Sequence, residues 1–450
     1  MSKIKAKKYQ VYTIRNFLKI KQLKKLTKEE LWNIEVAGNI LPFKVNNYVL
    51  DELIDWDNYL EDPMFNMTFP NREMLKPEFF DLMDSALKSS AGPKQINTVA
   101  RSIYKELNPH PAGQLELNVP EVNDIKLAGV QHKYRETVLF FPSAGQTCHS
   151  YCTFCFRWPQ FVGIADLKFS THEIKLLATY LYNHRDITDI LFTGGDPMIM
   201  SYNVFEKYLN PILELYEKSG LQTIRIGTKS LSYWPYKFIT DKNADDFIRL
   251  FERIVKKGLN LAFMAHFNHP RELGTKATEQ AIMRIRSTGA QIRTQSPILR
   301  HINNKPEIWS ELWRKQVNLN CIPYYMFVAR NTGAKHYFEL PLIETWEIFR
   351  QAYQQVSGVC RTVRGPSMSC TPGKVQVLGV SEIENQKIFV LRFIQGRNPD
   401  WAARPFFAKY DPDATWMNEL KPAFSDKFFF EDELENIYQQ KIITSELENF

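Results

Sequence analysis

From residue 138 onward, short apolar runs alternate with segments whose apolar residues recur at the helical period. Such runs predict strands, and the periodic segments predict amphipathic helices. The alternation indicates an α/β fold with a parallel sheet, although the pattern alone does not distinguish a barrel from a doubly wound sheet. The six predicted strands are Val138–Phe141, Asp189–Thr193, Thr223–Gly227, Leu259–Ala265, Gln291–Thr294 and Ile322–Val328. The predicted helices between them include one that begins at the capping pattern Ser170-x-x-Glu173 and runs to Asn183, and the segments Asp245–Lys257 and Pro306–Val317.

The segments on either side of this repeat have a different pattern. Residues 1–125 predict helices and loops, beginning with a capping box at Thr27-x-x-Glu30. After Pro341 we expect a helix over Leu342–Val356 and then a hairpin of Val375–Val380 with Lys387–Phe393. The predicted units are therefore 1–125, 126–340, 341–400 and an aromatic-rich extension, 401–450, that ends in a helix near Glu431–Lys441. We expect its aromatic residues, among them Trp401, Phe406, Phe407, Phe428, Phe429 and Phe430, to pack on the main body or on a partner subunit.

Composition narrows the class of protein. The chain has 450 residues, 44% of them hydrophobic, which is enough for a sizeable core. No apolar run reaches the roughly 18 residues of a membrane span, and no secretory signal is predicted, so we expect a cytoplasmic protein without a membrane partner. The net charge of +7 is concentrated in residues 1–25, which contain no acid. A solvated arm is favoured over a nucleic-acid site, since no aromatic array or known motif accompanies these charges.

Three cysteines, Cys148, Cys152 and Cys155, follow the first predicted strand with the spacing C-x3-C-x2-C. Three thiolates from one loop can hold three irons of a [4Fe–4S] cluster, and no nearby fourth cysteine is present to close the fourth iron. The alternatives are a zinc site or simply buried cysteines. Zinc sites usually show two separated pairs, or one pair with spaced histidines, so the spacing favours the cluster.

Further motifs follow the cysteines in a fixed order. They are Cys155-Phe-Arg157, Gly194-Gly-Asp-Pro197, Arg225-Ile-Gly227, His266-Phe-Asn-His-Pro270, Gln295-Ser296, Pro323-Tyr-Tyr325 and Pro372-Gly-Lys374. In this order, from about Asp62 to about Phe393, the chain resembles the lysine 2,3-aminomutase family of radical S-adenosylmethionine (SAM) enzymes. The resemblance implies a partial (β/α)6 barrel with an N-terminal helical region and a C-terminal α+β extension. It also implies SAM on the open iron, cleavage to a 5′-deoxyadenosyl radical, an external electron donor such as flavodoxin or ferredoxin, and a homo-oligomer.

The same resemblance suggests roles for single residues. Lys374 stands seventeen residues after Ser357, at the interval of the family's pyridoxal-phosphate lysine. The family's arginine for the cofactor phosphate is missing, because Thr137 occupies its place, and Arg135 is the expected substitute. Arg157 matches the arginine that holds the substrate α-carboxylate. The expected SAM-binding residues, which end predicted strands where barrel active sites are built, are Gly194, Gly195, Asp196, Arg225, His266 and Gln295.

Two departures from the family concern the substrate. The lysine enzymes bind the distal ammonium with two aspartates, and Arg330 and Ser367 stand in their places. Burying a guanidinium against an ammonium is unfavourable, so we expect a glutamate-like amino acid, whose amino group moves from C2 to C3. Alternatively, Arg330 binds the cofactor phosphate or a surface acid. Two other functions remain open: a radical SAM reaction without pyridoxal phosphate, and a non-catalytic iron–sulfur or zinc protein.

Overall fold

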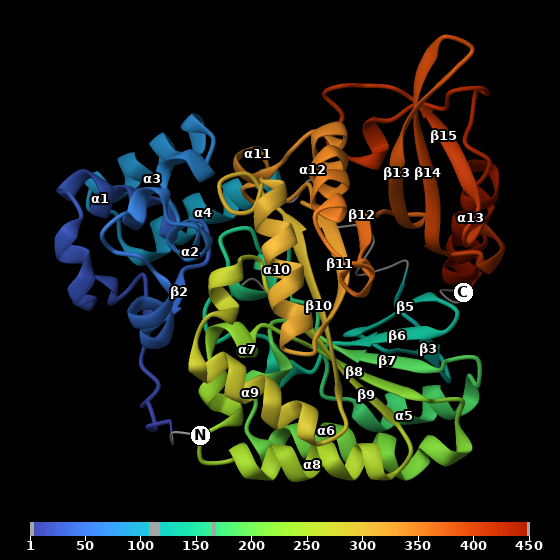
Figure 1. The fold of residues 1–450 in the computed structure, drawn as a ribbon, viewed down its shortest axis with the longest axis horizontal. Coiled ribbons are helices and arrows are strands. Elements are labelled where there is room, and N and C mark those ends of the chain that lie inside the picture. The colour runs from blue at the N-terminus through green and yellow to red at the C-terminus, as the bar shows by residue number, and fades with distance from the viewer. Residues whose placement is uncertain (1–3, 108–117, 164–167, 448–450) are drawn as a thin grey trace.

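A computed structural model describes residues 4–107, 118–163 and 168–447. Its centre is an eleven-stranded sheet in which consecutive strands are neighbours from β5 to β15 (Figure 1). The strands from β6 to β12 run parallel, and those from β12 to β15 run antiparallel. The strands are β5 (Val130–Tyr134), β6 (Thr137–Phe140), β7 (Asp189–Phe192), β8 (Thr223–Thr228), β9 (Asn260–His266), β10 (Gln291–Ile298), β11 (Ile322–Val328), β12 (Arg364–Ser369), β13 (Gly373–Ile383), β14 (Gln386–Gly396) and β15 (Pro405–Lys409).

All six predicted strands are confirmed as β6 to β11, and the α/β class with them. The prediction missed two strands that flank this set. Strand β5 pairs antiparallel with β6, and β12 pairs parallel with β11. Polar residues hide β5, and Gly365-Pro366 inside β12 gave that segment the pattern of a turn.

Helices connect the parallel strands and pack on the sheet, because their apolar faces and the strands bury a common core. The Ser170-x-x-Glu173 capping box is wrong. The Ser170 hydroxyl instead accepts a hydrogen bond from Ser143, and the Thr171 hydroxyl accepts one from the Glu173 amide. The helices are α5 (Ile174–Asn183), α6 (Tyr202–Leu215), α7 (Ser230–Tyr233), α8 (Ala244–Lys256), α9 (Lys276–Ser287), α10 (Pro306–Asn318), α11 (Lys335–Phe338) and α12 (Leu342–Gln354).

The N-terminal region forms a helical layer at one side of the sheet (Figure 1). The predicted capping box is confirmed, with Thr27 and Glu30 bonded in both directions at the start of α1. This region shares one hydrophobic cluster with Trp158, Tyr233 and Trp234 of the central part. It contains α1 (Lys28–Gly38), α2 (Pro63–Thr68), α3 (Pro77–Lys88), α4 (Pro93–Leu107) and the unpredicted antiparallel pair β1 (Val11–Thr13) and β2 (Lys44–Asn46). The short pair β3 (Glu121–Val122) and β4 (Ile125–Lys126) follows it.

The predicted solvated arm is only partly exposed. Lys5 and Lys8 face solvent, but Lys7 forms ion pairs with Asp51 and Glu52, each at 3.0 Å. The Tyr9 hydroxyl donates a hydrogen bond to the His149 carbonyl at 2.8 Å. The beginning of the chain therefore packs against the cysteine loop.

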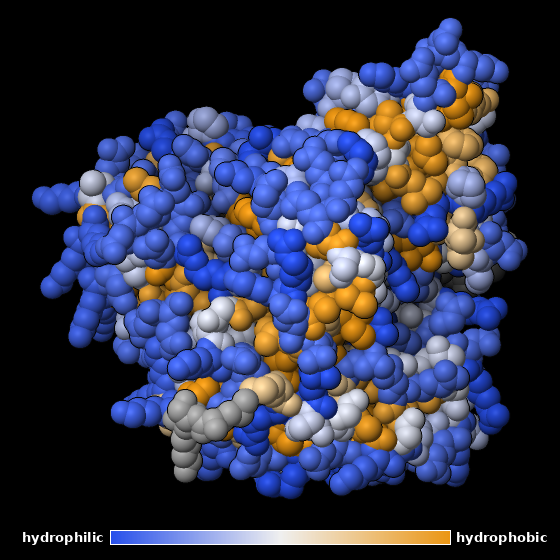
Figure 2. Space-filling model, viewed as in Figure 1, coloured by the Kyte–Doolittle hydropathy of each residue, from blue (hydrophilic) through white to orange (hydrophobic). Residues whose placement is uncertain are grey.

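The C-terminal extension is built on the predicted hairpin, which is confirmed as β13 and β14. Trp401, Phe406, Phe428 and Phe430 are buried against this hairpin and β15, in a cluster that also contains Val328 of β11. Helix α13 (Glu431–Leu447) lies beside these strands (Figure 1). Hydrophobic side chains gather on the surface over β13, whereas the N-terminal helices are mostly hydrophilic (Figure 2). No helix in the described ranges is long and apolar enough to cross a membrane.

Candidate active site

A cavity of about 300 Å³ lies at the carboxyl ends of the parallel strands. Its wall contains all three cysteines of the loop after β6 and, from the other side, Lys374 of β13. Residues far apart in the sequence thus meet at one place, as expected for the strand ends of an α/β sheet. The other predicted site residues on the wall are Gly194, Gly195, Arg225, His266, Gln295, Arg157 and Arg330.

The N-terminal layer positions the cysteine loop. The Tyr151 amide donates to the carbonyl of Lys44 in β2 at 2.8 Å, and the Thr153 amide donates to the carbonyl of Met67 in α2 at 2.9 Å. The Ser150 hydroxyl also donates to the Lys44 carbonyl, at 2.9 Å. A loop that lacks regular secondary structure is therefore held by backbone bonds to a different part of the chain.

The three thiols are suitable donors for an iron–sulfur cluster. They are free and half-buried, whereas Cys321, Cys360 and Cys370 are fully buried elsewhere. Burial raises the pKa of the Cys155 thiol to about 12 and that of the Cys148 thiol well above its usual range, so a bound metal is what would hold them as thiolates. Among the described side chains, no three of His, Cys, Asp and Glu are grouped so that they could hold a single metal ion. A cluster binds each thiolate through a different iron, and three thiols on one wall fit that requirement.

The two glycines after β7 allow the cysteine loop to pack closely. A Cβ on Gly195 would lie 2.5 Å from the Thr147 amide nitrogen, and Gly194 has a φ of +128° that disfavours other residues. We predicted that these glycines bind SAM. In this structure they line the cavity and also allow the approach of the neighbouring loop.

Asp196, which we expected to bind SAM, does not line the cavity. Its carboxylate is buried and already accepts bonds from the Thr228 and Ser230 hydroxyls and from the amides of Met198 and Lys229, at 2.7–2.9 Å. The carboxylate therefore joins the ends of β7 and β8 below the cavity wall.

The other predicted SAM-binding residues lie on three adjacent strands. His266 ends β9 as predicted, whereas Arg225 and Gln295 lie inside β8 and β10, which continue further than predicted. Arg225 Nε donates to Asp189 Oδ1 at 2.7 Å, so its charge is partly neutralised. Burial, followed by the positive charges of Lys229 and Arg157, lowers the pKa of His266 to about 3 and keeps the ring neutral.

Lys374 is a buried amine that faces the cavity without a hydrogen-bond or ion-pair partner among the described residues. Its Nζ lies 4.2 Å from the centre of the Tyr325 ring. Burial, followed by the charge of Arg225, lowers its pKa to about 8. A lysine of this kind has a neutral, nucleophilic fraction near neutral pH, which suits a carbonyl cofactor.

Arg135 does not lie where a cofactor phosphate could reach it together with Lys374. Its side chain is 59% exposed, pairs with Glu136 at 3.3 Å and is absent from the cavity wall. Lys133, two residues earlier on β5, is also absent from the cavity wall, but its ammonium group is buried and donates to the Cys370 carbonyl. Burial and the positive charge of Arg397 hold its pKa well below the usual range, and Arg330 and Lys374 act in the same direction. Strand β5 ends at Tyr134, so Lys133 lies within the strand and Arg135 lies beyond its end.

Two arginines on the cavity wall have no acidic partner among the described residues. The Arg157 guanidinium lies 4.6 Å from the Phe141 ring centre and 4.9 Å from that of Phe156, and the Arg330 guanidinium lies 5.1 Å from Phe156. Burial lowers the pKa of Arg157 to about 10. Ser367 is fully buried in β12, where its hydroxyl donates to the Met326 carbonyl at 3.4 Å, so its predicted position in the substrate site is wrong.

The cavity wall contains six cationic side chains and, within the described residues, no Asp or Glu. Three of these cations, Arg225, Lys229 and Lys335, pair with acids that lie behind the wall. Arg157, Arg330 and Lys374 are the others. The cavity therefore presents unpaired positive charge, which favours ligands with carboxylate or phosphate groups.

Sequence reasoning missed a buried ion pair next to the cysteines. Lys229 Nζ lies 2.5 Å from Glu272 Oε1 and 2.9 Å from Asn268 Oδ1. Its Nζ also lies 4.5 Å from the Tyr233 ring centre, and the Tyr233 hydroxyl lies 3.5 Å from the Cys152 sulfur. The available signal was the position of Lys229 just after Arg225-Ile-Gly227 and of Glu272 just after His266-Phe-Asn-His-Pro270.

No protein-family model matches the chain. A protein of Aquifex aeolicus named "Putative L-lysine 2,3-aminomutase" is 27% identical over 406 residues, which cover 90% of this chain and 95% of that one. L-lysine 2,3-aminomutase of Clostridium subterminale is 26% identical over 64% of each chain, and glutamate 2,3-aminomutase of Clostridioides difficile is 26% identical over 47% of each. The solved structure of a radical SAM methyltransferase from Sphaerobacter thermophilus gives a TM-score of 0.38 at 12% identity, covering 65% of this chain and 94% of that one. Along most of its length the chain is thus similar to proteins named lysine 2,3-aminomutase, and it carries three cysteines on one cavity wall.

Proposed function

We propose that this protein is a radical SAM aminomutase that moves an amino group from C2 to C3 of an amino acid with a carboxylate side chain. The observation that carries the proposal is the single cavity that contains Cys148, Cys152, Cys155 and Lys374 on its wall. Relatives named for lysine and glutamate 2,3-aminomutation support the reaction type. We propose that strands β6 to β11, with the helices between them, form the partial barrel of residues 126–340. Strand β12, from residues 341–400, would add one more parallel strand to it.

Cys148, Cys152 and Cys155 would hold the [4Fe–4S] cluster, and Gly194, Gly195, Arg225, His266 and Gln295 would surround SAM. When bound, the cluster and SAM supply a carbon-centred radical able to remove hydrogen from an unactivated carbon. The neutral His266 can donate or accept a hydrogen bond in this pocket without adding charge. Asp196 would not contact SAM. It would only hold the ends of β7 and β8 in position next to the SAM site.

Lys374 would attach pyridoxal phosphate, and Lys133 replaces Arg135 as the proposed partner of its phosphate. Lys133 lies among cations, including Arg397 and Lys374, and has no carboxylate partner among the described residues. A buried group of cations without acids is unfavourable unless an anion is bound. A cofactor phosphate near Lys133 would remove that penalty.

The unpaired arginines favour a substrate with two carboxylates. Arg157 would bind the α-carboxylate, and Arg330 would bind the side-chain carboxylate, each with two parallel hydrogen bonds. Phe156 lies against both guanidinium groups and would keep them apart. A lysine side chain would find no acid on the described cavity wall, so glutamate fits this charge distribution better.

Anaerobic reconstitution with iron and sulfide, followed by a SAM-cleavage assay with a panel of amino acids, tests the proposal. We expect reductant-dependent formation of 5′-deoxyadenosine and a β-amino acid product from glutamate. Replacing Cys148, Cys152 and Cys155 with alanine should remove the iron, whereas replacing Cys321, Cys360 and Cys370 should not. Iron retained by the first triple variant would overturn the assignment. SAM cleavage without uptake of pyridoxal phosphate would favour the alternative radical reaction.

A further inference from the structure

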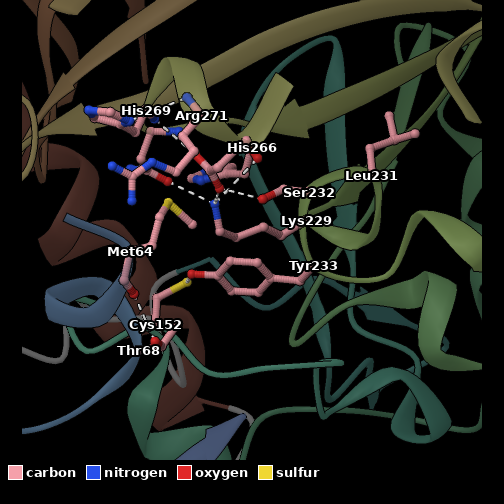
Figure 3. Close-up of polar contacts among 12 residues, drawn as sticks. Met64, Thr68, Cys152, Lys229, Leu231, Ser232, Tyr233, His266, His269 and Arg271 are labelled. Atoms are coloured by element: carbon pink, nitrogen blue, oxygen red, sulfur yellow. Dashed lines mark hydrogen bonds and ion pairs between the residues drawn. The ribbon is translucent and has the colours of Figure 1, made fainter. Parts of the chain in front are cut away.

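Tyr233 occupies an unusual position for a buried tyrosine. It ends the short helix α7 after β8, is only 1% exposed, and directs its hydroxyl toward the sulfur of Cys152 (Figure 3). The oxygen and the sulfur are 3.5 Å apart, which is within hydrogen-bonding range for sulfur. This is the hydroxyl's one hydrogen bond in the described part of the chain.

The direction of this bond depends on the state of Cys152. A thiol can donate to the phenol oxygen, but a thiolate bound to iron has no proton to donate. With iron present, the tyrosine hydroxyl becomes the donor and the sulfur the acceptor. The bond therefore acts on the cluster through the charge of one of its ligands.

The surrounding residues fix the geometry of the bond. One side-chain amide, Nδ2 of Asn46, donates to the Tyr233 carbonyl at 2.8 Å and to the His149 carbonyl at 3.1 Å. The Ser230 hydroxyl lies 2.9 Å from Nδ1 of His149. Helix α7 and the cysteine loop are thus connected at two further points, so that the hydroxyl and the sulfur are held next to each other before any metal binds.

The ammonium group of Lys229 strengthens the phenol as a donor. It lies 4.5 Å from the ring centre, where a cation draws electron density from the π system and makes the hydroxyl proton more positive. Glu272 holds the ammonium in this position at 2.5 Å. Glu272 thus contacts Lys229, Lys229 lies next to the Tyr233 ring, and the Tyr233 hydroxyl lies next to the Cys152 sulfur.

We propose that Tyr233 is a positioning residue that raises the reduction potential of the cluster by donating a hydrogen bond to the Cys152 thiolate. Reduction adds negative charge to the cluster, and a donor at a ligand sulfur stabilises that charge. This inference rests on the proposed cluster at the three cysteines. It concerns the ease of the first electron transfer, before SAM is cleaved.

The test compares Tyr233→Phe with the unmodified protein in a redox titration of the reconstituted cluster, followed by electron paramagnetic resonance without SAM. Loss of one hydrogen bond to a charged acceptor is expected to shift the equilibrium between oxidised and reduced cluster about tenfold toward the oxidised form, which is 59 mV for one electron. Tyr48→Phe is the matched control, because Tyr48 is equally buried and its hydroxyl lies 2.7 Å from Thr275, away from the cluster. Its potential should equal that of the unmodified protein.

An unchanged potential in a Tyr233→Phe protein that holds its cluster would overturn the inference and leave the proposed function intact. An unmodified protein that binds no iron at the three cysteines would instead overturn the proposed function. If Tyr233→Phe does not fold, the unmodified protein decides the question by electron–nuclear double resonance in D₂O. A proton that exchanges for deuterium and couples to the reduced cluster is expected, and its absence refutes the bond.

Discussion

At the scale of single residues, charge decides what the cavity can bind. Lys374 is the clearest case, because its burial lowers the pKa to about 8. The neutral amine attacks an aldehyde, and its fraction increases as the pH rises through the pKa. We therefore expect the rate of pyridoxal phosphate uptake to rise between about pH 7 and about pH 9 and then to level off.

Absorbance after addition of the cofactor measures this uptake, and borohydride should trap the cofactor on the peptide that contains Lys374. Lys374→Arg is the control, since its side chain stays protonated and should take up none. Uptake by Lys374→Ala with the same pH profile would show that another amine is responsible.

Reversal of one charge should change the choice of substrate. In Arg330→Asp, the proposed partner of the side-chain carboxylate becomes a repelling group. We expect kcat/KM for glutamate to fall by about 30-fold or more, corresponding to at least about 2 kcal/mol. Competition among glutamate, aspartate, glutamine, arginine and lysine measures the preference.

Arg101→Asp makes the same change on an exposed face of α4 and should leave that preference unchanged. Preferential turnover of lysine by the unmodified enzyme would refute the charge argument for the substrate.

The sequence predicted residues on the cavity wall well where a motif fixed their position. The three cysteines, the glycine pair and Lys374 all belong to short motifs tied to a strand end. Ser367 was placed by counting back from Lys374, and the count did not show that this serine lies inside a strand. Inside β12 its side chain is fully buried and its hydroxyl donates to the Met326 carbonyl, whereas Ser369, two residues later on the same face of the strand, lines the cavity.

At the scale of secondary-structure elements, the close contact between the end of β7 and the cysteine loop is the most demanding feature. A methyl group on Gly195 would be 2.5 Å from the Thr147 amide nitrogen and 2.6 Å from its carbonyl oxygen, so the loop backbone must move. We expect Gly195→Ala to lower the free energy of unfolding by about 1–3 kcal/mol and to reduce the iron bound per chain. Denaturant unfolding and iron analysis measure the two effects.

Gly358→Ala is the matched control, because no atom lies within 4 Å of the added Cβ. Equal iron content in both variants would mean that the loop adapts to the extra methyl group without losing the site.

Element positions were predictable wherever hydrophobic periodicity was strong, as for β11, whose bounds are the predicted ones. Periodicity failed for β5 and β12, where polar residues, glycine and proline interrupt the pattern. It also could not show that α7 carries Tyr233 to Cys152. That contact depends on tertiary packing between segments 81 positions apart.

At the scale of the whole molecule, the N-terminal layer is part of the site's framework. Asn46 is fully buried, donates to the carbonyls of His149 and Tyr233, and accepts from the amides of Tyr48 and Val49. Asn46→Ala leaves these buried groups without partners, at about 1–3 kcal/mol for each group that water cannot reach. We expect a loss of at least about 3 kcal/mol in the free energy of unfolding and faster release of iron to a chelator.

The neighbouring Asn47→Ala removes two exposed hydrogen bonds to the chain near Lys8 and Gln10 and should change the stability by less than about 1 kcal/mol. Iron release at the same rate in both variants would show that the N-terminal layer does not hold the loop. The sequence predicted this region as a helical cap on the part that follows, but it did not show which residues share a core with the strand ends.

The backbone bonds from Tyr151 to Lys44 and from Thr153 to Met67 have a consequence for synthesis on the ribosome. Chains fold from the N-terminus as they emerge, so the partners of the cysteine loop exist before the cysteines themselves leave the exit tunnel. Lys374 emerges more than two hundred residues later. We therefore expect a nascent chain that ends before β12 to present its thiols in an open half-site, accessible to the machinery that delivers iron and sulfide. Translation of the last strands would then close the cavity over a finished cluster.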